Sequence, residues 1–166
     1  ESFLLRNTTA FYLDLITTDL KAKDKPSAIK EITEMFARTG LMADPLDYYR
    51  NVLFYAEEGR IWFYGGLAFL ESQAVVKDRI LVAVAISKNG VPFKSFGRNP
   101  VKIFLAVACP KEEKSGPSPR LKILAYLSLF LEKLEFRAAI MNARSDEELF
   151  AFLKENLEKN WNLLKP

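Results

Sequence analysis

Apolar residues recur at helical spacing in the first third of the chain. Ile29, Ile32 and Phe36 are separated by three and four positions, which places them on one face of a predicted helix. Pro26 suits the first turn of that helix because proline has no backbone N–H to satisfy. Gly40 stands where a glycine commonly follows the last helical turn. The pattern therefore predicts a helix between this proline and this glycine.

The middle of the chain has the pattern of strands. Residues 79–88 and 101–108 contain apolar runs of the length of a buried strand. Shorter runs at 61–64 and 67–70 are separated by two glycines, and they predict two more strands. The Asn-Gly pair at 89–90 follows the first long run and is typical of a tight hairpin turn.

Helices are predicted on both sides of these strands. Asp44 and Pro45 open a second helix in front of them, and residues 136–142 predict a short helix behind them. Ser145 and Glu148 have the spacing of a capping box that begins the last helix. One more helix is predicted from leucines that share one face: Leu124, Leu127, Leu131 and Leu134. This order predicts an α/β sandwich with a mostly central sheet.

Length and charge limit the class of protein. We expect one domain over residues 1–166, with an N-terminal segment, 1–18, of uncertain structure. Lys and Arg number 24 against 21 Asp and Glu, and this net charge of +3, without a dense basic stripe, predicts no nucleic-acid partner. No stretch approaches the roughly 20 apolar residues of a membrane helix, so no direct membrane insertion is expected. The first residue is Glu1, from which we expect a chain cut from a longer one.

Two residue counts limit the chemistry. The sequence contains no histidine, which excludes phosphohistidine intermediates, His-based triads and imidazole metal sites within these residues. Cys109 is the one cysteine, which excludes an intrachain disulfide and a thiolate-rich zinc site. A single free thiol fits a reducing, cytoplasmic compartment. Carboxylate chemistry, one thiol or no chemistry remain, and no metal or cofactor is expected.

The segment at 66–71, Gly-Leu-Ala-Phe-Leu-Glu, resembles the enzyme IIA domains of the bacterial phosphotransferase system, of the fructose, mannitol and nitrogen-regulatory type. That family carries Gly-Ile-Ala-Ile-Pro-His at this place, and the histidine accepts the phosphoryl group. Five further segments agree with the family in the same order: 25–29, 90–93, 99–107, 121–127 and 145–149. The resemblance implies the fold of that family, an α/β/α sandwich with a central mixed β-sheet flanked by helices, and, in its active members, phosphoryl transfer.

The departures from the family pattern fall on its chemical residues. By this resemblance Glu71 stands in place of the acceptor histidine, and Arg120 in place of a second active-site histidine. Arg-Ile-Trp at 60–62 replaces a Ser-Thr-Gly, and Tyr-Ala at 55–56 replaces an Arg-Glu pair. The resemblance therefore implies a vestigial phosphoryl-acceptor site, without a catalytic residue, formed by Glu71, Arg120, Arg60 and Trp62.

Each of these residues has a second interpretation. Glu71 is either a fixed negative charge at the old acceptor position or an ordinary surface carboxylate, and Arg120 could pair with it and fill the pocket. Arg60 and Arg120, with nearby lysines, form either an anion site or a solvated basic loop. Trp62 is either a partner surface or core filler. Cys109 is either a reactive thiol or a small buried residue at a strand end.

These observations predict a non-catalytic regulatory domain that acts by protein binding. Its partner would be a regulatory protein or a fused transporter or regulator domain, as the resemblance implies. One alternative is a phosphocarrier that uses Glu71 or Cys109. The other is a sensor of an anion or small molecule at the vestigial pocket.

Overall fold

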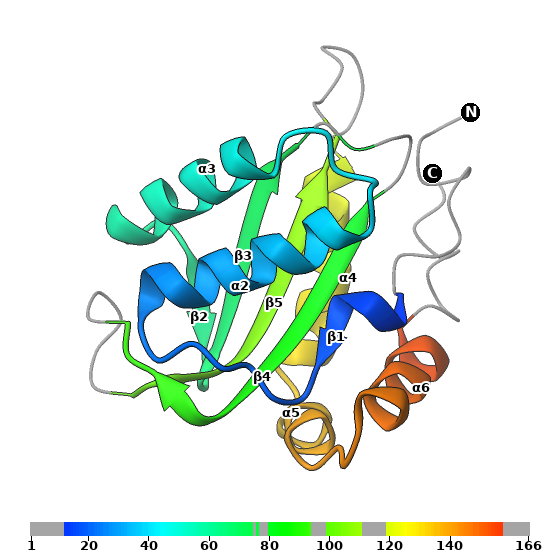
Figure 1. Ribbon diagram of the computed structural model, residues 1–166. Coiled ribbons are helices and arrows are strands. Elements are labelled where there is room, and N and C mark those ends of the chain that lie inside the picture. Colours follow the sequence, from blue (N-terminus) through cyan, green and yellow to red (C-terminus); the bar gives the residue numbers. More distant parts are fainter. Residues whose placement is uncertain (1–11, 75, 77–79, 94–98, 111–118, 158–166) are drawn as a thin grey trace.

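The computed structural model describes residues 12–74, 76, 80–93, 99–110 and 119–157, and over 119–124 it describes the backbone alone. The strands are β1 (Ile16–Thr17), β2 (Trp62–Tyr64), β3 (Leu67–Gln73), β4 (Leu81–Val91) and β5 (Val101–Cys109). The helices are the short 3-10 turn η1 (Leu13–Leu15), α2 (Lys25–Arg38), α3 (Pro45–Glu57), α4 (Pro119–Leu131), α5 (Leu134–Met141) and α6 (Asp146–Asn156). Figure 1 shows the arrangement of these elements, coloured along the chain from blue at the N-terminus to red at the C-terminus.

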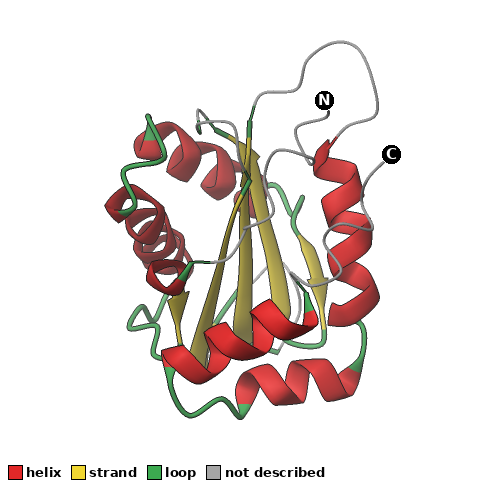
Figure 2. Cartoon of the chain, turned by 90° about the vertical axis from the view of Figure 1, so that its right-hand side faces the viewer, coloured by secondary structure: helices red, strands yellow, loops and turns green. Residues whose placement is uncertain are grey.

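The five strands form one mixed sheet in the order β1-β4-β5-β3-β2. β1 is parallel to β4, and β3 is parallel to β5, whereas β4 with β5 and β2 with β3 are antiparallel. Helices pack on both faces of this sheet (Figure 2). The prediction of an α/β/α sandwich with a central mixed sheet is confirmed.

Alternate residues of the central strands belong to two separate cores. In β3, Ala68 and Leu70 pack with α2 and α3, while Leu67 and Phe69 pack with α4, α5 and α6. The same alternation runs through β4 and β5, so these strands are buried on both faces. This double burial explains why the sequence shows unbroken apolar runs there and not an alternation of apolar and polar residues.

Three helices begin with a side chain that accepts the backbone N–H three residues later: Asp24 for α2, Asp44 for α3 and Ser145 for α6. The predicted capping box is confirmed in its first half only. Glu148 donates its amide to the Ser145 hydroxyl oxygen at 3.1 Å, but its carboxylate accepts the amide of Arg144, at 3.3 Å, and not that of Ser145.

The hairpin turn expected at 89–90 was wrong, because β4 continues through it to Val91. The pairing of β4 with β5 shifts register between Ile86 and Val91, and it resumes with Val91 opposite Val101. Gly90 has a φ of +83°, and its amide donates to the Ser87 hydroxyl oxygen at 3.1 Å. The Asn-Gly pair thus forms an irregularity within a strand, because pairing beyond it outweighs the local turn preference.

The helix face predicted from four leucines is confirmed at two positions and wrong at one, and the side chain of the remaining one, Leu124, lies outside what the structure describes. Leu127 and Leu131 are buried in the core under the sheet, as expected. α4 ends at Leu131, however, and Leu134 begins α5 with 70% of its side chain exposed. Lys133 has extended backbone angles between the two helices, which turns Leu134 away from the face that the spacing predicted.

No helix among the described residues is both long and apolar enough to span a membrane.

Candidate functional site

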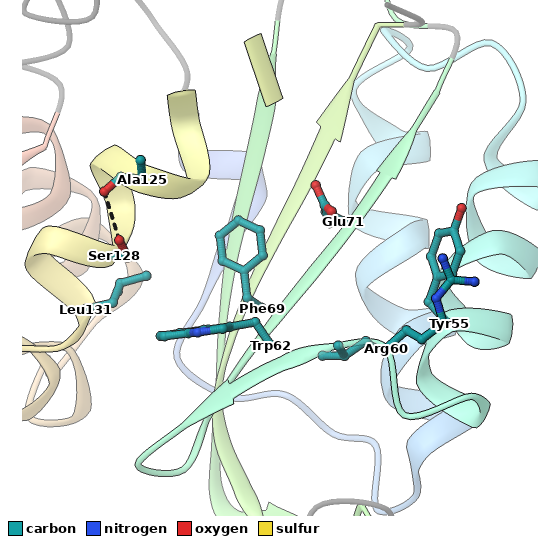
Figure 3. A pocket seen from close by; sticks show the side chains of 9 residues that line it. Tyr55, Arg60, Trp62, Phe69, Glu71, Ala125, Ser128 and Leu131 are labelled. Atoms are coloured by element: carbon teal, nitrogen blue, oxygen red, sulfur yellow. Dashed lines mark hydrogen bonds between the residues drawn. The ribbon is translucent and has the colours of Figure 1, made fainter. Parts of the chain in front are cut away.

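A pocket of about 410 Å³ lies beside β3, where this strand extends past its neighbour β2. β2 pairs only with the first part of β3, and Trp62 opposite Phe69 is the pair nearest the pocket. Glu71 follows two residues later on the same face of the strand and borders the pocket (Figure 3). The lining residues are Tyr55, Arg60, Ile61, Trp62, Phe69, Glu71, Ala125, Ser128 and Leu131.

The walls of the pocket come from both helical layers. Tyr55 near the end of α3, with Arg60 in the following loop, forms one wall. Ala125, Ser128 and Leu131 form the other wall, because their spacing of three places them on one side of α4. In Figure 3 the two groups lie on opposite sides of Glu71. The pocket is therefore closed by elements far apart in the sequence.

Aromatic rings form a stack at one end of the pocket. Trp62 meets Phe69 edge to face, with ring centroids 6.5 Å apart and an interplanar angle of 86°. Trp62 also stacks on Tyr64, at 5.9 Å and 12°. The guanidinium of Arg137, from α5, lies over the Tyr64 ring at 4.8 Å from its centroid. Trp62 is 36% exposed, so its indole has contacts on the protein side and an open side at the pocket.

Glu71 brings a carboxylate to the pocket from the part of β3 that lies beyond its pairing with the edge strand β2. Its side chain is half-buried and its Oε2 atom is shielded from solvent. The charge acts across the sheet on Tyr48 of α3, whose hydroxyl donates to the Val107 carbonyl at 3.0 Å. Burial raises the pKa of Tyr48 well above its ordinary value, and electrostatic interactions with Cys109 and Glu71 raise this pKa further.

Arg60 brings a positive charge to the same pocket. Its backbone N–H donates to the carbonyl of Tyr55 at 2.8 Å, which holds the loop against the end of α3. Its guanidinium lies over the Tyr55 ring, 5.1 Å from the centroid. The side chain is exposed, so the guanidinium remains accessible from solvent.

The structure brings together three of the four residues predicted for the site. Glu71, Arg60 and Trp62 line one pocket. The fourth, Arg120, is in the first turn of α4, but its side chain lies outside what the structure describes, so its ion pair with Glu71 stays a prediction. The lysines at 111 and 114 of the predicted basic loop also lie outside the described residues.

Sequence reasoning missed much of the lining as functional surface. Phe69 could have been found, because it stands two residues before Glu71 on a predicted strand. Ala125 and Ser128 gave no chemical signal, since small side chains are common on any helix. Cys109 does not line the pocket and is 1% exposed, in agreement with its interpretation as a small buried residue.

No group of three or more Cys, Asp or Glu side chains within the described part of the chain is placed to hold a metal ion. Among the described residues that line the pocket, the polar groups are the Glu71 carboxylate, the Arg60 guanidinium and the hydroxyls of Tyr55 and Ser128. These groups can accept or donate hydrogen bonds and can pair with a charged group. The pocket is therefore suited to binding a polar or charged ligand.

Comparison with known protein families identifies the family of this chain. The family model described as "Phosphoenolpyruvate-dependent sugar phosphotransferase system, EIIA 2" matches residues 10–156. The chain belongs to this EIIA 2 family. The resemblance inferred from segment 66–71 and its companions is thereby confirmed at the level of the family.

Solved structures share the EIIA fold at low sequence identity. The nitrogen regulatory protein IIA-Ntr from Neisseria meningitidis is 21% identical, with a TM-score of 0.72 over 87% of this chain and 96% of that one. IIA mannitol from Escherichia coli is 18% identical, with a TM-score of 0.67 over 86% of this chain and 98% of that one. IIA mannitol is also known in complex with phosphorylated enzyme IIB from Escherichia coli; that chain is 16% identical, with a TM-score of 0.66 over 88% and 98%. These likenesses establish the fold of this EIIA 2 domain.

Proposed function

We propose that this EIIA 2 domain is a non-catalytic regulatory domain that acts by binding a protein partner and is not phosphorylated at the family's usual position. The observation that carries this proposal is the absence of histidine from all 166 residues, in a family whose active members use one as acceptor. A pocket adjoins Glu71 in this structure, which supports the proposal. The site is thus proposed to keep its shape while it has lost its nucleophile.

The chemistry of Glu71 supports this proposal. A neutral imidazole is a good nucleophile near neutral pH, whereas a carboxylate carries a negative charge that repels an incoming phosphoryl group. Arg60 can offset part of that charge, but it is exposed and lies over Tyr55. In this proposal Glu71 provides a permanent negative charge at the position where an active relative gains negative charge by phosphorylation.

The surface around the pocket supports docking of a protein. Trp62 and Tyr64 are 36% and 45% exposed, and their rings stack beside the pocket. Aromatic side chains of this kind are enriched in the energetic centres of protein interfaces. A IIA relative forms a complex with its phosphorylated IIB partner, which supports a partner protein or a fused transporter or regulator domain for this chain as well. We also propose that residues 1–166 form a single domain and that this domain is cytoplasmic.

An intact-mass measurement tests the proposal. The protein is incubated with phosphoenolpyruvate and the general relay proteins of the phosphotransferase system, beside a histidine-containing IIA domain as positive control. We expect no mass increase in this chain. A gain of one phosphoryl group would overturn the proposal and would favour the alternative of a phosphocarrier that uses Glu71 or Cys109.

A rescue variant tests whether the pocket keeps its ancestral shape. The double substitution Glu71→His and Arg120→His restores both family histidines, and we expect it to accept one phosphoryl group. The matched control is Glu58→His, at an exposed glutamate outside the pocket, which should accept none. Failure of the folded double variant to be phosphorylated would contradict the inherited pocket.

A second candidate function is supported by the pocket itself. Small-molecule sites are typically concave cavities of about 300–1,000 Å³ with a few polar groups among apolar ones. The pocket beside Glu71 has this size and this lining. A sensor of a small ligand is therefore the alternative that a specific observation favours.

A further inference from the structure

We infer that the pocket beside Glu71 binds a small zwitterion, with an alkylammonium group at one end and a carboxylate at the other. The pocket has a volume of about 410 Å³, and the described residues that line it include a carboxylate, a guanidinium and three aromatic side chains. This inference goes beyond protein docking, because it concerns a ligand that the isolated chain binds without a partner.

The ammonium end is assigned to the part of the pocket lined by Glu71 and Phe69. Carboxylate charge attracts a cation, and the half-buried position of Glu71 keeps this attraction less screened than at an exposed carboxylate. Trp62 and Phe69 add ring surfaces beside it. Aromatic rings combined with a carboxylate are the groups that proteins use to recognise alkylammonium ions.

The carboxylate end is assigned to Arg60. A guanidinium presents N–H donors in a planar fork that matches the two oxygens of a carboxylate. Arg60 is exposed, and its position over the Tyr55 ring orients the guanidinium on the α3 side of the pocket. Figure 3 shows Arg60 and Tyr55 together on one side of Glu71, across from the α4 wall. An anion held by Arg60 therefore lies at the accessible side of the pocket.

The presence of both charges favours a zwitterion over a simple ion. A plain anion would be attracted by Arg60 and repelled by Glu71, and a plain cation would meet the opposite balance. A ligand with both charges is attracted by both residues. The Trp62 wall is already formed in the protein, because its ring stacks on Tyr64 and Tyr64 lies under Arg137. A preformed wall reduces the ordering cost of binding.

Four matched probes test the inference on the unmodified protein. Glycine betaine carries both charges; choline carries only the cation; 3,3-dimethylbutyrate, the carbon isostere of betaine, carries only the anion; and 3,3-dimethylbutanol carries none. Binding is measured by calorimetry and by the fluorescence of Trp62 in a Trp161→Phe background. β-Alanine is included as a primary ammonium zwitterion. We expect a zwitterion to bind at least about tenfold more tightly than every singly charged or neutral probe.

Two results would overturn the inference. One is saturable binding of the anion or cation alone as tight as that of both zwitterions, which would assign a simple ion site. The other is absence of saturable binding of both zwitterions at concentrations well above about 1 mM. Neither result bears on the docking proposal, which is tested by the mass measurement. Failure of the zwitterion inference can therefore be distinguished from failure of the docking proposal.

Substitutions then assign the two ends. Glu71→Gln should weaken betaine by about tenfold while it improves 3,3-dimethylbutyrate relative to betaine. Arg60→Gln should produce the converse, a relative gain for choline. Arg50→Gln is the matched control, since Arg50 is an exposed arginine of α3 that does not line the pocket. Equal effects of the Arg50 and Arg60 substitutions would overturn the assignment of the carboxylate end.

Discussion

The guanidinium of Arg137 lies 4.8 Å from the ring centroid of Tyr64 and so connects α5 to the edge strand β2. The same guanidinium donates a hydrogen bond of 2.6 Å to the carbonyl of Leu131, the last residue of α4. Tyr64 in turn stacks on Trp62. One arginine outside the pocket therefore holds together two of the elements that form it.

We predict that Arg137→Met lowers the free energy of unfolding by about 1–3 kcal/mol, because it removes a hydrogen bond from a charged donor and a cation–π contact. Urea unfolding measures this loss. The fluorescence of Trp62 should change as well, in the Trp161→Phe background. Tyr64→Phe is the control: it keeps the ring beneath the guanidinium and should change stability by less than about 0.5 kcal/mol. An Arg137→Met protein as stable as the control would contradict this account.

Gly90 and Gly59 provide a matched pair for the cost of close packing. Both have positive φ, +83° and +68°, so alanine is strained at either position. A Cβ at Gly90 would lie 2.6 Å from Cβ of Pro100, whereas a Cβ at Gly59 would meet nothing within 4 Å. We predict a loss of about 1–2 kcal/mol for Gly59→Ala from backbone strain and a larger loss for Gly90→Ala. Equal losses in urea unfolding would show that the Pro100 contact relaxes freely.

Stability should fall at alkaline pH because of two buried tyrosines. Burial raises the pKa of Tyr126 from 10.0 to about 12, and it raises that of Tyr48 well above 10.0. The folded chain therefore keeps these protons when the unfolded chain loses them. Their contribution to stability is complete below pH 10 and is lost as the pH rises from there through the folded-state pKa values.

Unfolding free energies at a series of pH values between neutrality and pH 12 check this expectation. Tyr126→Phe, which also loses the hydrogen bond to the Leu157 carbonyl, should be less stable at neutral pH but should decline less steeply above pH 10. A Tyr48→Phe substitution should flatten the decline further. If the unfolding free energy fell equally steeply above pH 10 in the parent and in a variant with both substitutions, the two tyrosines would not be the cause of the decline.

Asp146 should contribute more to stability than its neighbour in the same turn. Its Oδ1 accepts both the amide and the hydroxyl of Thr18, each at 2.8 Å, and so ties α6 to the end of β1. We predict a loss of about 1–3 kcal/mol for Asp146→Ala, together with faster exchange of the Thr18 amide hydrogen. Glu147→Ala removes the same charge from an exposed position and should cost only about 0.3–1 kcal/mol. Similar losses of unfolding free energy for both variants would show that the hydrogen bonds to Thr18 add nothing beyond the interaction of a negative charge with the helix dipole.

The fold was largely predictable from the sequence, because its strongest signals are buried. The apolar runs at 79–88 and 101–108 became β4 and β5, since a strand covered on both faces admits few polar residues. The Asn-Gly pair at 89–90 misled because it predicts a two-residue turn, whereas the chain turns later and Val91 pairs with Val101. A pairing partner ten residues along the chain leaves no mark on a two-residue segment.

The site was predictable only where a residue carries distinctive chemistry. Glu71, Arg60 and Trp62 stood out because they depart from the family's pattern, and they do share a pocket. The opposite wall could not be foreseen, since Ala125 and Ser128 have no distinctive chemistry and reach the pocket only through the packing of α4. The stack of Arg137 on Tyr64 joins residues from separate elements and leaves no periodic pattern.

The turn between β2 and β3 consists of Gly65 and Gly66, both with positive φ. Since β3 is fixed along its length by β5, an insertion of one residue in this turn would slide β2 and exchange the faces of Trp62 and Phe63. The smaller ring would then be presented to Glu71 and the indole would be directed under α3. The length of this two-glycine turn thus determines which aromatic side chain of β2 faces the pocket.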